Sequence, residues 1–508
     1  MVSDKYFTVI KVAIILFLLV VFGYKTFVML DPDLGWHLRA GEIVDTLGTA
    51  PVNDPWTYTM TGHKWVDHEW LGDWIIWKAH ENGGWLPVQI FFTLLIVIPL
   101  GHMVWRARYF LELAFIGAAS HLMLSIAGVR FQILSIFFFY LFYLALYPLR
   151  TKKSKWLYAV PVLFAVWANL HGGFVVALGL WSLVIVIHAF ETYRATKKIN
   201  SLKSHTAEVV ALLLSYLATL LTPYGTGLWI EIYEGTASSS IKYIQEWTPG
   251  LMFTGPILAT YFGAGGALIG FFIHSLDKKK TIPALMFLCS FLQHVRMAPF
   301  FFITTIPLIA TTCDMLYAKM RETGQRMTMI RMDMVGGTAL LLVYYFLGAQ
   351  MLVPRTPYVD AIKALNTPMI KSVPGNIFND YTLGGWMIYD DPTRKVFIDG
   401  RGPHWMDESG YSAFEEYMDI YTGTSTWRAS FATHNINVAI LGLDTPATDN
   451  DDSIIPKQLL DFLKKTLLPP TQISVTNELR NDGWCTVYQD TDATILIRPG
   501  YALCDKPI

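Results

Sequence analysis

Residues 8–37 read TVIKVAIILFLLVVFGYKTFVMLDPDLGWH, an apolar run that ends in a cluster of charged and polar side chains. The apolar part, 8–29, is long enough to cross a bilayer, which takes about 20 residues. It has no small-x-small cleavage site and continues directly into Asp31-Pro-Asp33, so we interpret it as a retained anchor and not as a signal peptide. This stretch predicts an integral membrane protein.

Similar apolar windows recur up to residue 352 and then stop. They predict an α-helical polytopic membrane protein with about eleven transmembrane helices. The short pairs 157–170 with 172–190 and 281–295 with 297–315 could each form a re-entrant hairpin instead, which leaves the count open. The predicted spans are 8–29, 88–105, 110–128, 132–149, 157–170, 172–190, 207–222, 252–275, 281–295, 297–315 and 333–352.

The composition agrees with a membrane protein and excludes other classes. Of the 508 residues, 53% are hydrophobic and only 16% are charged, whereas soluble domains carry about 25% charged residues. Disordered chains are poor in apolar and aromatic residues, so disorder is excluded. The formal net charge of −1 provides no basic field, and we expect no nucleic-acid partner.

The loops between the predicted spans differ in charge. One set contains 19 lysines and arginines and the other contains 7. Positive residues accumulate in cytoplasmic loops. The amino terminus is therefore expected on the cytoplasmic side of the cell inner or plasma membrane. Residues 353–508 are then expected outside it.

The tail has a different character from the rest of the chain. From residue 355 onward it contains 13 Lys and Arg against 20 Asp and Glu, a net charge of −7. We predict a transmembrane domain at 1–352 and an extracytoplasmic α/β domain at 353–508, in which Cys485 and Cys504 could pair in oxidising surroundings. The runs that indicate strands are 395–398, 438–443, 485–488 and 494–498, and those that indicate helices are 409–421 and 456–467.

The first outer loop, residues 30–87, carries the densest group of candidate functional residues. Asp31 and Asp33 follow the first span at the depth of a lipid headgroup, although an aspartate in this position could also simply cap the helix that begins at Leu34. Two helices are expected to lie along the interface in this loop. Its other candidate site residues are His37, His68 and Glu69.

Other polar residues are expected on the same outer side, each in a separate connection between spans. Ionisable groups at membrane depth are costly and usually line a cavity, so several on one side predict one shared polar pocket. A single one of them would more simply be an interfacial or satisfied interior group. They are Arg130, His171, Tyr224, Glu246 and Arg296.

Two arginines and two carboxylates suit a substrate with a phosphate and a reacting hydroxyl. The guanidinium fork matches phosphate geometry, which makes Arg130 and Arg296 candidate phosphate ligands. Asp33 or Asp31 could remove a proton from an acceptor hydroxyl as general base. Alternatively, the two aspartates could hold a divalent cation, Mg or Mn, that neutralises a leaving phosphate.

Several motifs resemble those of the GT-C superfamily of polytopic membrane glycosyltransferases, which includes protein mannosyltransferases and lipid A aminoarabinose transferases. More narrowly, the chain resembles bacterial GT-C-like proteins with an Asp-x-Asp-x-x-Trp-His start. The motifs are 31–37 DPDLGWH, 54–58 DPWTY, 68–71 HEWL, 169–174 NLHGGF, 223–225 PYG, 378–385 FNDYTLGG and 397–401 FIDGR.

The resemblance implies transfer of a sugar from a polyprenyl-phosphate donor to a glycan, lipid or protein acceptor on the extracytoplasmic face. It also implies an essential aspartate just after the first span, here Asp33 or Asp31, of which we favour Asp33. His37, His68, Glu69, His171 and Tyr224 are then expected to shape the substrate pocket.

Two other classes of function remain open from the sequence. A membrane transporter would favour paired halves with Gly- or Pro-broken helices, and Gly172-Gly173 is one such break. A non-catalytic assembly protein for cell-envelope polymers would use the tail as its working part, and a polymer ligase or polymerase would use the same lipid donors. In the tail, Asp399-Gly400-Arg401 could contact an acceptor sugar or form a structural ion pair.

Overall fold

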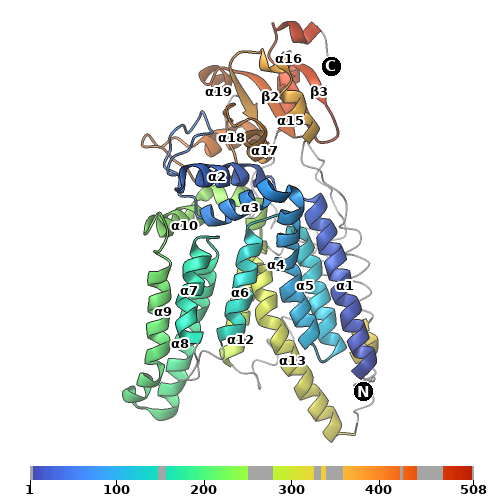
Figure 1. Ribbon diagram of the computed structural model, residues 1–508, viewed down its shortest axis with the longest axis vertical. Helices are drawn as coiled ribbons and strands as arrows, with labels where there is room; N and C mark the ends of the chain where they lie inside the picture. Colours follow the sequence, from blue (N-terminus) through green and yellow to red (C-terminus); the bar gives the residue numbers. More distant parts are fainter. Residues whose placement is uncertain are drawn as a thin grey trace.

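The protein is a bundle of long apolar helices with a small mixed α/β unit at one end (Figure 1). The computed structural model describes residues 4–146, 156–249, 278–324, 333–338, 359–423, 427–442 and 473–505. The amino terminus lies at the end of the bundle opposite the α/β unit. The bundle helices are α1 (Asp4–Val28), α4 (Trp85–Arg106), α5 (Phe110–Ile126), α6 (Gln132–Leu146), α7 (Trp156–Ala168), α8 (Phe174–Thr196), α9 (Thr206–Ala218), α12 (Lys278–Gln293) and α13 (Ala298–Glu322).

These helices lie where the apolar windows predict spans. Among the described residues, four helices are long and apolar enough to cross a membrane, namely those over 5–28, 85–106, 174–196 and 295–322, and four shorter apolar helices accompany them. The predicted span 252–275 and most of 333–352 lie outside the described residues. A mostly helical membrane protein is therefore confirmed, and the number of eleven crossings stays a prediction.

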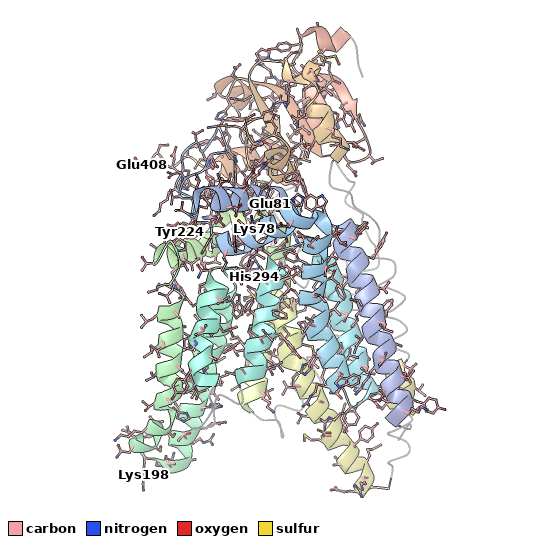
Figure 2. The ribbon with its side chains drawn as sticks, viewed as in Figure 1. Lys78, Glu81, Lys198, Tyr224, His294 and Glu408 are labelled. Atoms are coloured by element: carbon pink, nitrogen blue, oxygen red, sulfur yellow. A yellow bond between two sulfur atoms is a disulfide. The ribbon has the colours of Figure 1, made fainter. Side chains whose placement is uncertain are left out.

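Short helices lie across one end of the bundle, between it and the α/β unit (Figure 1). In the first loop these are α2 (Leu34–Leu47) and α3 (Trp70–Gly83), the two interfacial helices that the sequence predicts, and α10 (Gly227–Ala237) lies at the same level. Lys198 lies at the far end of the bundle, while Tyr224 and His294 lie near this layer (Figure 2).

The α/β unit contains one four-stranded sheet in the order β1-β2-β4-β3. The strands β1 (Asn376–Asn379) and β2 (Ile436–Gly442) are parallel, and β4 (Ala493–Ile497) is antiparallel to both β2 and β3 (Cys485–Gln489). A disulfide joins Cys485 to Cys504. The helices of this unit are α15 (Val359–Leu365), α16 (Pro368–Lys371), α17 (Gly384–Asp390), α18 (Ala413–Thr422), α19 (Trp427–Thr433) and α21 (Val475–Asn481).

The sheet buries both faces because successive side chains of a strand point to opposite sides. Phe378, Ala439 and Leu496 pack on one side with aromatic residues of α18 and α19. Val438 and Ile495 belong to the other side, in the larger core cluster that also includes Trp386 of α17. The central strand β2 is thus almost fully buried, as its apolar sequence predicts.

Two predictions for the tail need correction or lie beyond the structure. The run 395–398 forms no strand: Val396 makes only an isolated bridge to Thr57 of the first loop, and the following residues are buried as a loop. The sequence also gave no signal for β1, which is only four residues long. The predicted helix 456–467 lies outside the described residues.

The α/β unit docks on the first loop by close backbone contact. A methyl group added to Gly35 of α2 would overlap the carbonyl group of Gly385 in α17, and one added to Gly385 would overlap the carbonyl oxygen of Pro32. Arg39 of α2 also donates to the backbone oxygen of Tyr389. The glycines at 35 and 385 therefore allow two segments 350 positions apart to pack without a gap.

Candidate active site

A cavity of about 250 Å³ lies where the first loop, the helix connections and the α/β unit meet. We call it the charged pocket. It contains six carboxyl groups, three arginines and four histidines among the residues that the structure describes. The ionisable residues in its wall are Asp31, Asp33, His37, Asp67, His68, Glu69, Arg130, His171, Glu231, Glu246, Arg296, Arg401 and His404.

The structure brings together nine of the ten polar residues that the sequence indicates for this pocket. The nine that line the charged pocket are Asp31, Asp33, His37, His68, Glu69, Arg130, His171, Glu246 and Arg296. Tyr224 does not: its hydroxyl donates to the backbone oxygen of Pro51, 2.6 Å away. Tyr224 lies at the expected level of the bundle, but its side chain serves the loop and not the pocket.

Asp31 and Asp33 differ in their surroundings. Asp31 accepts a hydrogen bond from the backbone N–H of Asp33 (2.9 Å) and forms an ion pair with Arg130. This pair is set by the backbone, because Val129 donates to the carbonyl oxygen of Met29 and so aligns the two loops. Asp31 is therefore held by the protein itself.

Asp33 is the N-cap residue of α2, but its side chain makes no capping hydrogen bond. The carboxylate instead lies against Gly400, where a methyl group on the glycine would overlap it. Burial, together with the neighbouring charge of Asp31, raises the pKa of Asp33 to about 8. The simple capping interpretation is wrong, and the carboxyl group is left to face the pocket with a pKa near neutrality.

Glu69 lies among three histidines. Its carboxylate oxygens are 3.5 Å from Nε2 of His171, 3.7 Å from Nε2 of His37 and 3.8 Å from Nε2 of His68. Burial raises the pKa of Glu69 well above its usual range, with a further rise from Asp67. Burial likewise lowers the pKa of each of the three histidines, so the rings are neutral at neutral pH.

Hydrogen bonds fix the orientation of two of these rings. Nδ1 of His171 accepts from the backbone N–H of Gly173 at 3.0 Å, which leaves the ring proton on Nε2, toward Glu69. Nδ1 of His37 lies 2.7 Å from the carboxylate of Asp73, and the ring stacks on Phe131. The polar wall around Glu69 is thus rigidly held.

The three arginines of the pocket have different partners. Arg130 is paired with Asp31 and, at 2.8 Å, with Glu246. Arg401 is paired with Asp54 and Asp399, both at 2.7 Å. Arg296 makes no ion pair with any described residue; its guanidinium lies over the ring of Trp247, 4.3 Å from the centroid. Arg296 is therefore the arginine whose charge is available to an anionic ligand.

Several wall residues were not indicated as site residues by the sequence. Glu231 and His404 lie outside the motifs quoted above, whereas Tyr381 belongs to 378–385 and Gly400 to 397–401. Arg401 was noted as either a sugar contact or an ion pair, and the structure shows the ion pair. A motif such as Asp-Gly-Arg is the one signal that could have pointed to this wall.

The residues do not fit the predicted divalent cation well. Within the ranges that the structure describes, no three His, Cys, Asp or Glu side chains are arranged to hold a metal ion. One carboxylate oxygen of Asp31 is already bound by Arg130. A metal on Asp31 and Asp33 stays a prediction, and we derive no chemical step from it.

By sequence, no family model and no curated protein matches the chain. By structure, it is similar to the Archaeoglobus fulgidus oligosaccharyltransferase AglB in complex with an inhibitory peptide and a dolichol-phosphate, with a TM-score of 0.59 and 11% identity over 87% of this chain and 70% of that one. An A. fulgidus oligosaccharyltransferase tethered with an acceptor peptide gives 0.55 and 12% over 86% and 69%. ArnT from Cupriavidus metallidurans, bound to undecaprenyl phosphate, gives 0.47 and 14% over 99% of both chains.

The likeness to the oligosaccharyltransferase structures shows a shared fold. It agrees with the helical membrane bundle carrying a small α/β unit that the sequence predicts.

Proposed function

We propose that this protein is a membrane glycosyltransferase that moves a sugar from a polyprenyl-phosphate donor to an acceptor in the charged pocket. The observation that supports this most is that two ionisable groups of the pocket form no ion pair with any described residue. Arg296 lies over Trp247 without a carboxylate in ion-pair contact, and Asp33 has a pKa raised to about 8. An anion and a proton are the two things that such a site would take up.

In this reaction the acceptor hydroxyl attacks the anomeric carbon of the donor sugar. A C–O bond to the acceptor forms, the bond between the sugar and the phosphate oxygen breaks, and the hydroxyl proton passes to Asp33. The polyprenyl phosphate leaves as an anion on Arg296, with Arg130 beside it. A general base works best with a pKa near the working pH, which fits Asp33.

The remaining pocket residues support these two. Asp31 fixes the backbone of Asp33 and the side chain of Arg130. Glu69 with His37, His68 and His171 forms the polar wall that orients the sugar. The charged pocket is lined by residues of α2 and of the α/β unit, which lie at the end of the bundle opposite the amino terminus. The loop charges favour the extracytoplasmic side for that end.

The test is lipid binding and sugar transfer by the purified full chain. We expect Arg296→Ala to weaken binding of undecaprenyl phosphate and to slow transfer from a polyprenyl-phosphate sugar. The matched control is Arg321→Ala, which removes an exposed arginine at the far end of the same helix α13. Parent-like lipid binding by Arg296→Ala would contradict the proposal.

A further inference from the structure

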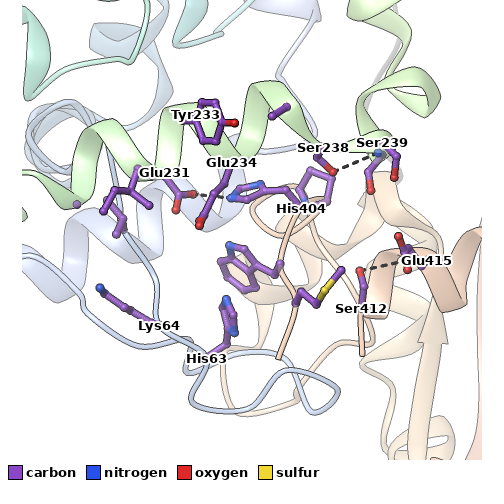
Figure 3. A pocket seen from close by; sticks show the side chains of 18 residues that line it. His63, Lys64, Glu231, Tyr233, Glu234, Ser238, Ser239, His404, Ser412 and Glu415 are labelled. Atoms are coloured by element: carbon purple, nitrogen blue, oxygen red, sulfur yellow. Dashed lines mark hydrogen bonds and ion pairs between the residues drawn. The ribbon is translucent and has the colours of Figure 1, made fainter. Parts of the chain in front are cut away.

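A second cavity of about 560 Å³ adjoins the charged pocket. We call it the side pocket, and Figure 3 shows its walls. Its size lies within the range of about 300–1,000 Å³ that is usual for ligand sites. The wall comes from α10, the 3₁₀ turn Ser239–Tyr243, the first-loop residues 63–66 and the segment 403–415.

The two cavities share one wall. Val66, Glu231, Pro403 and His404 line both of them. Nε2 of His404 lies 2.9 Å from a carboxylate oxygen of Glu231, and the dashed line in Figure 3 marks this pair. Both side chains are 12% exposed. A ligand in the side pocket is therefore separated from the charged pocket by this shared wall, which includes the His404–Glu231 pair.

The charges of the side pocket are opposite to those of a phosphate site. Its wall contains Glu231, Glu234 and Glu415, against a single lysine, Lys64, and no arginine. Burial lowers the pKa of His63, which keeps that ring neutral. Such a wall repels anions and favours neutral or positively charged ligands. Phosphate belongs to the charged pocket, and a different reactant is needed for this one.

The remaining wall groups suit a polyhydroxylated ligand. Serine hydroxyls of residues 238, 239 and 412 line the cavity beside the carboxylates. Trp405 forms part of the wall; it is 4% exposed, and its indole N–H has no hydrogen-bond partner among the described residues. Hydroxyls both donate and accept hydrogen bonds, ionised carboxylates accept them, and the indole N–H of Trp405 is a further donor.

We propose that the side pocket binds the acceptor, and that this acceptor is a neutral or amine-bearing glycan. That the ligand is the acceptor of the reaction rests on the proposed function. That the ligand is a neutral or amine-bearing glycan rests on the residues that line the side pocket. The glycan chain lies against Glu234 and Trp405, and its terminal hydroxyl passes the His404–Glu231 pair to reach Asp33. Anionic acceptors are excluded by the carboxylates.

The probes are three trisaccharides of different charge: chitotriose with free amines, neutral maltotriose and anionic trigalacturonate. Each is titrated into the full chain in lipid nanodiscs by calorimetry. We expect chitotriose and maltotriose to bind at least tenfold more tightly than trigalacturonate. Trigalacturonate that binds as tightly as the other two, the absence of binding by all three, or binding of a lysine-rich peptide but of no trisaccharide would overturn the proposal.

A charge reversal tests the location of the ligand. Glu234 is exposed in the side pocket, so Glu234→Lys is expected to leave the fold intact and to weaken chitotriose binding about tenfold, which corresponds to about 1.4 kcal/mol. The matched control is Glu408→Lys, an exposed glutamate outside both pockets (Figure 2), expected to change binding less than twofold. Equal effects of the two reversals would overturn the proposal.

The two proposals fail in different ways. Binding of undecaprenyl phosphate depends on Arg296 and not on Glu234, so it is measured on the same preparations. If Arg296→Ala binds undecaprenyl phosphate as the parent does while Glu234→Lys still weakens chitotriose binding, the donor site is refuted and the side-pocket proposal is not. The reverse result would refute the side pocket alone.

Discussion

Two arginines on the walls of the same pocket show two uses of a buried positive charge. Arg401 is 1% exposed in its side chain, binds Asp54 and Asp399, and has the rings of Trp56, Trp65 and Trp405 within 5.2 Å. Arg296 lies over one ring, that of Trp247, and forms no ion pair with any described residue.

The difference separates a charge that holds the structure from one that is free for a ligand. Arg401 joins the first loop to the α/β unit, because Asp54 and Asp399 are 345 positions apart, and both are bound by the same guanidinium nitrogen. A buried ion pair of this kind gives a defined arrangement more than it gives net stability. Arg296 gives no such link, and the proposed function assigns its charge to the phosphate of the donor lipid.

The largest effect is expected from the group that receives the proton. Asp33→Asn should lower the rate of sugar transfer by about 10²–10⁴-fold, the range for loss of a general base. Because ionised Asp33 is disfavoured in the folded protein, the melting temperature should not fall. Asp45→Asn, an exposed carboxylate on the same helix α2, is the control and should keep the parent rate. A parent-like rate in Asp33→Asn would remove Asp33 from the mechanism.

Arg401→Met should break the link between the first loop and the α/β unit. It leaves two buried carboxylates without a counter-charge, which costs about 3–5 kcal/mol. We expect a large fall in the melting temperature and dissociation of the α/β unit from the first loop, measured by limited proteolysis. Restored stability in the triple variant with Asp54→Asn and Asp399→Asn would attribute the loss to the carboxylates. A stable Arg401→Met protein would show that the link is not needed.

Arg296→Lys sharpens the functional member. The charge is kept, but the planar fork that matches a phosphate is lost, and a charge-assisted hydrogen bond contributes about 1.5–3 kcal/mol. We expect undecaprenyl phosphate to bind about tenfold more weakly, measured in nanodiscs, with the melting temperature unchanged. If the lysine variant binds the lipid as the parent does, the site requires only a positive charge.

The pH dependence tests Asp33 without relying on a lost side chain. Its pKa in the folded protein is about 8, above the usual value of about 3.9. A base has to be deprotonated, so transfer should rise with pH and level off above about 8. The raised pKa also means that folding loses stability as pH rises from about 4 through 8. In Asp33→Asn both trends should be smaller, which melting curves and residual rates at several pH values can measure.

The smallest effect is expected at Tyr224. Its hydroxyl donates to the carbonyl oxygen of Pro51, so Tyr224→Phe should cost about 0.5–1.5 kcal/mol of stability. The transfer rate and lipid affinity should stay within twofold of the parent. A large loss of activity with an unchanged melting temperature would return Tyr224 to the site.

The sequence predicted at which end of the helix bundle each site residue lies better than it predicted whether the side chain faces the pocket. Apolar length fixed the ends of the helices, and connections at one end brought Arg130, His171 and Arg296 together. Tyr224 lies at the same end and turns away, because the direction of a side chain depends on tertiary packing. The span alone does not specify it.

Contacts between the tail and the first loop had no local signal. Residues 395–398 have the composition of a strand, but within the described residues the segment forms only an isolated bridge, between Val396 and Thr57. Gly400 is recognisable as part of a turn, while its contact with Asp33 depends on how two distant segments dock. Such pairs are not visible in one sequence, because neither member changes the local pattern.

The contact between Gly400 and Asp33 also determines when, during synthesis of the chain, the charged pocket can form. Asp33 leaves the ribosome early, whereas the residues that complete its surroundings are made more than 360 positions later. At a synthesis rate of about 5–20 residues per second, Gly400 is made on the order of 20–70 seconds after Asp33. During that interval the membrane helices are inserted while the reaction centre is still incomplete. Under the proposed function, a nascent chain therefore cannot transfer a sugar until its tail has been made and docked.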